Sequence, residues 1–282
     1  MSSSNINSSA VEKPPPALNI PSGSTVSVKI IDNTTILYDL GTRKDLENLA
    51  PVTVRLMDKP DWKYTIEKDV ADILVENGVV LNTIEAVVWS HWHFDHTGNM
   101  KTFPPSVNLI VGSGFKKGLL PGYPTNKNSH VLEADWEVRD LIELDFNTDL
   151  KLGKFKTIDY FSDGSFYLLD TPGHAIGHTS ALARVSKGFN GEKDTFVFLG
   201  GDLCHHEFDA ADNVLVIIAH DSAPLMPSSG FQFFPDGTLN NWKKDKLDEK
   251  IRWSFLTDFS HAVENGLKQE TTLKAGLVFK PN

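Results

Sequence analysis

Residues 90–98 have the sequence SHWHFDHTG, which places three histidines and one aspartate within six positions. The apolar run before them, residues 84–89, predicts a buried strand that ends at this cluster. Imidazole nitrogens and carboxylate oxygens are ligands that zinc, iron and manganese accept. The cluster therefore predicts a metal site at the end of a strand.

His91 and His93 occupy alternate positions of an expected extended segment, so they point to the same side and can hold one ion. Asp95 and His96 turn the other way as the strand becomes a loop, and they would serve a second ion. The alternative is a strand-end cluster of hydrogen-bonded histidines without metal. Four such groups at this spacing favour the metal site.

Three later apolar runs also end in side chains that can bind metal. They are residues 166–170 followed by His174, residues 195–199 followed by Asp202, and residues 214–219 followed by His220. In an α/β sheet, ligands collect beyond the strand ends at one edge. The three side chains are therefore candidates to complete the site.

These motifs resemble those of the metallo-β-lactamase superfamily of metal-dependent hydrolases. The other matching elements, in the family's order, are Asp39-Leu40-Gly41, TPGH at 171–174, GGD at 200–202 and AHD at 219–221. Longer strings such as SHWHFDHTGNMKTFP and DYFSDGSFYLLDTPGHAIGH are most similar to a group of fungal members described as lactonase-like. The resemblance implies an α/β fold, the αββα sandwich of two mixed sheets flanked by helices.

The resemblance also implies a dinuclear centre. The first ion would be held by His91, His93 and His174. The second would be held by Asp95, His96 and His220, with Asp202 bridging the two. Zinc is the favoured metal, with iron and manganese as alternatives.

Chemistry at such a centre needs no nucleophilic side chain, because a hydroxide held between two ions can attack an acyl carbon. Asp95 would also carry a proton to the leaving group. His178, Asp39 and Asp221 are expected either to orient the metal ligands or to serve ordinary structural roles.

The chain has 282 residues, of which 40% are hydrophobic, and a formal net charge of −10. We expect a disordered tail at residues 1–22, rich in Ser, Asn and Pro, and one hydrolase domain at residues 23–282. The negative charge disfavours nucleic acid as a partner. No apolar run approaches the ~20 residues of a membrane span, and no secretory pattern is visible. With a single cysteine, Cys204, these features predict a cytoplasmic protein.

Local patterns predict further elements. They are paired strands from Val26 to Leu40, a helix at 66–75 that ends at Asn77-Gly78, a hairpin at Asp163-Gly164, and helices at 239–250 and 253–267.

The segment between Asp202 and His220 is short, with 17 residues from Leu203 to Ala219. Members of the family place a much longer stretch here, which helps to wall the substrate pocket. The expected function is hydrolysis of a small cyclic ester or amide, a lactone or γ-lactam. The alternatives are an acyl-thioester hydrolase of a polyketide-type pathway and a catalytically silent binding protein that results from the short link.

Overall fold

The computed structural model describes residues 35–58, 65–203, 211–219, 221 and 237–252. Several predicted features lie outside these residues and stay predictions: the tail at 1–22, the strand that begins at Val26, Cys204, His220, and the helix at 253–267.

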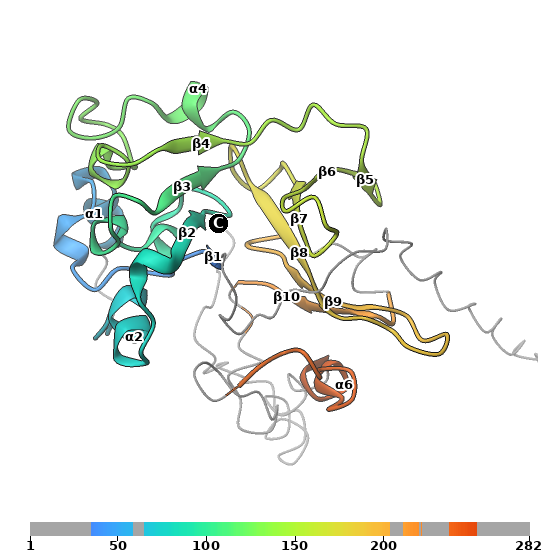
Figure 1. Cartoon of the computed structure of the whole chain (residues 1–282). Helices are drawn as coiled ribbons and strands as arrows, with labels where there is room; N and C mark the ends of the chain where they lie inside the picture. The colour runs from blue at the N-terminus through green and yellow to red at the C-terminus, as the bar shows by residue number, and fades with distance from the viewer. Residues whose placement is uncertain (1–34, 59–64, 204–210, 220, 222–236, 253–282) are drawn as a thin grey trace, which may run out of the picture.

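A parallel sheet of four strands forms the first half of the described chain (Figure 1). Its strands lie in the order β1 (Thr35–Tyr38), β2 (Ile84–Val88), β3 (Asn108–Val111) and β4 (Leu141–Glu143). Parallel neighbours need crossover connections, and these contain short helices. The helices are α1 (Pro51–Met57), α2 (Val70–Glu76), α3 (Phe94–Thr97) and α4 (Phe115–Leu119), with 3-10 turns η1 (Leu46–Asn48), η2 (Leu81–Thr83), η3 (Met100–Thr102) and η4 (Glu133–Asp135).

A mixed sheet of six strands forms the second half. Its strands are β5 (Lys151–Leu152), β6 (Phe155–Asp159), β7 (Phe166–Asp170), β8 (Thr179–Ser186), β9 (Thr195–Leu199) and β10 (Val214–Ile217). Neighbours from β5 to β9 are antiparallel, whereas β10 runs parallel to β9. Thus one described sheet is mixed as expected, while the first is parallel throughout its described strands.

The two sheets pack face to face. Ala86 and Val88 of β2 share a buried core with Leu168 of β7 and Ala181 of β8. Val87 points to the other side of β2 and joins the core beneath α2 and α4. Four of the five residues of β2 are buried, on both faces of the strand, which is why its sequence is mostly apolar without alternation.

Helix α2 is shorter than the predicted 66–75 helix because Asp69 caps it. The Asp69 side chain accepts a backbone N–H of the first turn, and the Asp72 side chain accepts the Asp69 N–H at 3.1 Å. The predicted end at Asn77-Gly78 is confirmed, with Gly78 at a φ of 80°.

The hairpin prediction at Asp163-Gly164 is confirmed by the antiparallel pairing of β6 with β7. In contrast, the helix predicted at 239–250 is wrong over residues 239–246, because α6 spans only Leu247–Arg252. Lys246 has a φ of 55°, a left-handed conformation that a continuous helix cannot include. None of the described helices combines the length and the apolar character needed to traverse a bilayer.

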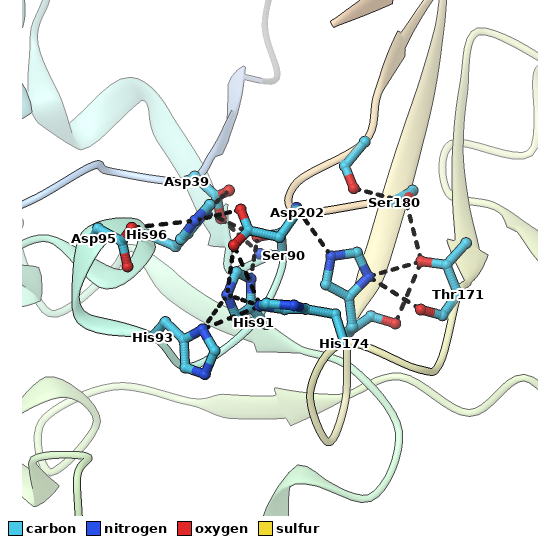
Figure 2. Close-up of polar contacts among 12 residues, drawn as sticks. Asp39, Ser90, His91, His93, Asp95, His96, Thr171, His174, Ser180 and Asp202 are labelled. Atoms are coloured by element: carbon cyan, nitrogen blue, oxygen red, sulfur yellow. Dashed lines mark hydrogen bonds and ion pairs between the residues drawn. The ribbon is translucent and has the colours of Figure 1, made fainter. Parts of the chain in front are cut away.

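The carboxyl ends of four strands converge at one edge of the sandwich. Asp39 follows β1, the histidine cluster follows β2, His174 follows β7, and Asp202 follows β9 (Figures 1 and 2). This convergence brings together segments that are far apart in the sequence.

Candidate metal centre

The histidine cluster does not continue β2 as an extended segment, which corrects the sequence-based expectation. Residues 90–93 form a bend, and Asp95 and His96 lie on the single-turn helix α3 instead of a loop. Gly98 ends this turn at a φ of 55°, and a Cβ there would lie 2.3 Å from Cβ of Leu40. Only glycine fits, so the cluster is pressed closely against the segment that follows β1.

Three imidazoles nevertheless point toward one place (Figure 2). Nε2 of His91 lies 2.9 Å from Nδ1 of His93, and Nε2 of His174 lies 3.2 and 3.1 Å from these two atoms. Two ligands of a tetrahedral zinc ion, each about 2.05 Å from the metal, would be about 3.3 Å apart. The three nitrogens therefore have the spacing of a shared metal site.

Asp202 lies between this group and His96. Its Oδ2 is 3.2 Å from Nε2 of His174 and 3.9 Å from Nε2 of His91. Its other oxygen, Oδ1, is 3.0 Å from Nε2 of His96. The two carboxylate oxygens thus face two different groups, as a bridging ligand requires.

Asp95 is on the His96 side of the cluster, with Oδ2 3.9 Å from Nε2 of His96. Side-chain exposure rises from 0% at His91 to 12% at Asp202 and 31% at His174. The cluster is therefore most open on the side of His174. His220, the remaining predicted ligand, lies outside the described residues.

Burial favours the neutral form of two of these imidazoles, His91 and His93. It lowers the pKa of His91 and of His93, and nearby histidines lower the pKa of both further. A neutral imidazole has a free lone pair, which is the form that binds metal.

The pKa of His96 shifts in the opposite direction, because its ring is hydrogen-bonded to the carboxylate of Asp39. Its Nδ1 lies 2.7 Å from Oδ2 of Asp39, whose Oδ1 accepts the backbone N–H of Ser90 at 2.6 Å. Burial alone would lower the pKa of His96, but the hydrogen bond and charge of Asp39 outweigh it and the pKa is raised. Burial of Asp39 in turn raises the pKa of its carboxyl. Asp39 thus fixes the orientation of the His96 ring, as its predicted outer role requires.

Ser90 is a residue that the sequence reasoning missed. Its hydroxyl lies 3.0 Å from Nδ1 of His91 and 3.2 Å from Nδ1 of His96, opposite the ring nitrogens that face Asp202. Its position directly before the motif was the available signal. Asp221, the other predicted support, lies between two residues that are not described, and its role stays a prediction.

Gly201 allows Asp202 to reach the cluster. It has a φ of 58°, and a Cβ there would lie 2.9 Å both from Cβ of Ser90 and from Nε2 of His178. His178 is buried, and its Nε2 accepts the backbone N–H of Asp202 at 3.3 Å. His178 therefore hydrogen-bonds to the main chain of Asp202, and its ring also lies against the rings of His91 and His174, with centroids 5.3 and 5.8 Å away.

Comparison with known proteins identifies the family. Residues 21–114 match the sequence family described as "Metallo-beta-lactamase superfamily". Gamma-lactamase MBL2 of Gibberella moniliformis is 51% identical over 173 residues, which cover 61% of this chain and 71% of MBL2. Metallo-hydrolase mfmC of Annulohypoxylon moriforme is 33% identical over 94% of this chain and 97% of mfmC. The chain belongs to the metallo-β-lactamase superfamily, and the predicted fold class is confirmed.

Lengths differ among the relatives. Gamma-lactamase FDB1 of Fusarium pseudograminearum is 48% identical over 64% of this chain, but this match spans only 43% of FDB1. The alignment with mfmC has 375 positions, whereas 94% of the 282-residue chain is about 265 residues. About 110 positions of that alignment therefore have no residue from this chain.

Proposed function

We propose that this chain is a dinuclear metal-dependent hydrolase that opens a small cyclic amide or ester, a γ-lactam or a lactone. The observation that carries the proposal is the position of Asp202, which turns one oxygen to the three-histidine group and the other to His96. The names of MBL2 and FDB1 as gamma-lactamases support the cyclic amide.

The donor atoms fit two divalent ions. His91, His93 and His174 would hold one, His96 and Asp95 would hold the other together with the predicted ligand His220, and Asp202 would join both. All donors are nitrogen or oxygen, which suits zinc and also permits iron or manganese.

Two such ions supply an activated water and polarise the carbonyl group of the substrate. The residues of the chain then orient and move protons. Asp202 fixes the spacing between the two halves of the site, and Asp39 holds His96 in one orientation. Asp95, at the rim near His96, would carry the proton from the water to the departing nitrogen or oxygen. The substrate would enter beside His174, the most exposed member of the cluster.

A second candidate function is metal binding with little turnover. The short segment from Leu203 to Ala219 and the roughly 110 positions missing relative to mfmC favour it. If the missing residues wall the pocket, their absence weakens substrate orientation more than metal binding, because the ligands come from the strand ends.

One experiment tests both candidates. Protein purified from medium with added zinc, iron and manganese is assayed for metal by elemental analysis, and then for hydrolysis of γ-lactams, lactones and acyl thioesters. We expect up to two ions per chain and faster cleavage of the cyclic substrates than of thioesters. Absence of metal would overturn the hydrolase proposal. Metal without turnover, with activity gained when a family-length segment replaces 203–219, would establish the second candidate.

A further inference from the structure

Three polar side chains at or beside the ends of the loop that carries His174 are fully buried, and Figure 2 labels two of them, Thr171 and Ser180. They are Thr171, His178 and Ser180, with exposures of 0%, 1% and 0%. Thr171 follows β7, His178 directly precedes β8, and Ser180 is the second residue of β8. Buried polar groups need partners, so their bonds define what this region holds in place.

The bonds form a continuous chain. The Asp202 N–H donates to Nε2 of His178 at 3.3 Å. Nδ1 of the same ring lies 3.0 Å from Oγ1 of Thr171 and 3.1 Å from the Thr171 carbonyl oxygen. Oγ1 of Thr171 lies 3.0 Å from Oγ of Ser180, which donates to the carbonyl oxygen of Gly200 at 3.2 Å.

Proton positions follow from the two ends. Because Nε2 of His178 accepts from a backbone N–H, the ring proton must be on Nδ1, which donates to Thr171. Because the Ser180 hydroxyl donates to Gly200, its oxygen is left to accept from the Thr171 hydroxyl. The other acceptor near that hydroxyl, the His178 carbonyl oxygen, is more distant at 3.5 Å. Every donor in the chain therefore points the same way.

We propose that Thr171, His178 and Ser180 are positioning residues that set the carboxylate of Asp202. The chain of bonds starts at the Asp202 N–H and ends at the Gly200 carbonyl, so both ends are on one turn. The residue between them, Gly201, is packed against Ser90 and His178. The turn is thus held at both ends and in the middle.

The proposal rests on the proposed dinuclear centre and predicts an unequal effect on its two ions. Two of the three histidines of the first group come from the segment after β2, and one comes from the 171–178 loop that Thr171 helps to close. The second ion depends more strongly on the direction of Oδ1 of Asp202, which faces His96. A less firmly held turn should therefore lower the affinity for the second ion more than the affinity for the first.

The test uses Thr171→Val and Ser180→Ala, which remove one hydroxyl each, with Thr171→Ser as the conservative variant that restores it. Thr157→Val is the matched control, because Thr157 is also fully buried in the same sheet but its hydroxyl bonds only within β6. Zinc affinity for each ion is measured by chelator competition, and the melting temperature of the metal-free protein by calorimetry.

We expect Thr171→Val and Ser180→Ala to weaken binding of the second zinc ion roughly 10-fold, at the lower end of the range for outer partners, with a smaller loss for the first ion. Thr171→Ser should bind both ions as the natural chain does. Thr157→Val should lower the melting temperature about as much as Thr171→Val without changing either affinity. Equal affinities in all variants, or loss of both ions in step with the melting temperature, would overturn the proposal.

The ring proton of His178 provides a readout that does not need metal binding. Nitrogen-15 NMR of the metal-free protein should show Nδ1 of His178 protonated and Nε2 unprotonated. A proton on Nε2 would overturn the proposal even if the protein binds two ions. If the natural chain binds no metal while the ring proton is on Nδ1, the proposed function fails, and the positioning role falls with it.

Discussion

The two sides of the centre are held by different physical means. On the side of the first sheet, a buried carboxylate, Asp39, fixes the side chain of His96 through a 2.7 Å hydrogen bond. On the side of the second sheet, neutral hydroxyls and one neutral imidazole fix the main chain of Asp202. The first support is charged and orients a ring, whereas the second is neutral and orients a turn.

This difference has consequences for strength and for pH dependence. Hydrogen bonds to charged groups are stronger than those between neutral groups. Their strength depends on pH, however, because the bond weakens when the charged group changes its protonation state. A series of hydrogen bonds between neutral groups stabilises the structure less per bond. Its strength does not change with pH as long as the imidazole in it stays neutral. Burial lowers the pKa of His178 to about 4, so that range includes neutral pH.

The largest effect is expected where the two sides meet. Asp202→Ala removes the group that faces both, so zinc binding should fall by more than the ~10–100-fold typical of outer partners, and hydrolysis should fall with it. Chelator competition and a lactam assay measure the two losses. Asp212→Ala, which removes an exposed carboxylate, is the control and should change neither. Retention of both ions by Asp202→Ala would show that this residue does not bridge.

The second effect concerns the contact between the sides at Gly201. Gly201→Ala puts a Cβ 2.9 Å from Ser90 and from His178 at a φ of 58°, so it strains the backbone and pushes against both supports. We expect a loss of about 2–4 kcal/mol in the free energy of unfolding, measured with urea. Gly78→Ala is matched, because its φ is 80° but nothing lies within 4 Å of the added Cβ. It should lose only about 1–2 kcal/mol. Equal losses would show that crowding at Gly201 is unimportant.

The sequence was most informative where structure is local. Strands β2, β7, β9 and β10 follow from apolar runs, and the candidate ligands follow from the polar residues at the ends of those runs. Burial on one or both faces leaves this signal in a few consecutive residues. The sequence could not show that the cluster bends into α3, because a single turn of helix has no periodic pattern.

Long-range supports were less predictable. The sequence leaves His178 as either an outer partner of the ligands or an ordinary structural residue, and it gives no reason to single out Thr171 or Ser180. Their bonds join segments that come together only when β8 pairs with β7 and with β9. The direction of a hydrogen bond depends on tertiary geometry, which local sequence does not contain. Lys246, where a predicted helix is interrupted, illustrates the same limit for backbone conformation.

A third prediction separates the charged support from the neutral one. Asp39→Asn keeps the size of the side chain but removes its charge, so the ring of His96 loses a charge-assisted bond. The second ion should bind about 10–100-fold more weakly, a larger loss than for Thr171→Val. Asp45→Asn, which weakens an ion pair with Arg43 in the same region, should leave zinc affinity unchanged. A smaller loss in Asp39→Asn than in Thr171→Val would reverse the proposed order of the two supports.

The last prediction concerns a buried carboxyl group in the first half of the chain, whose effect is spread over several pH units. Asp135 in η4 is 4% exposed, and burial raises the pKa of its carboxyl to about 7, although Arg43 and Arg139 act to lower it. A pKa raised on folding means that the native protein holds this proton more tightly than the unfolded chain does. The stabilisation is therefore complete below about pH 4 and is lost as the pH rises through 7.

We expect the free energy of unfolding to fall by about 1 kcal/mol for each unit by which the pH rises between about pH 5 and pH 7. Asp135→Asn, which resembles the protonated carboxyl, should remove this slope and be more stable than the natural chain above pH 7. Urea unfolding at several pH values measures this dependence, and the metal-free protein is used so that bound metal does not affect its stability.

Thr171→Val, in contrast, should lower the free energy of unfolding by the same amount at pH 6 and pH 8, because no group in its hydrogen-bonded chain titrates in that range. An unchanged slope in Asp135→Asn would show that the buried charges of the first half do not control its pH dependence.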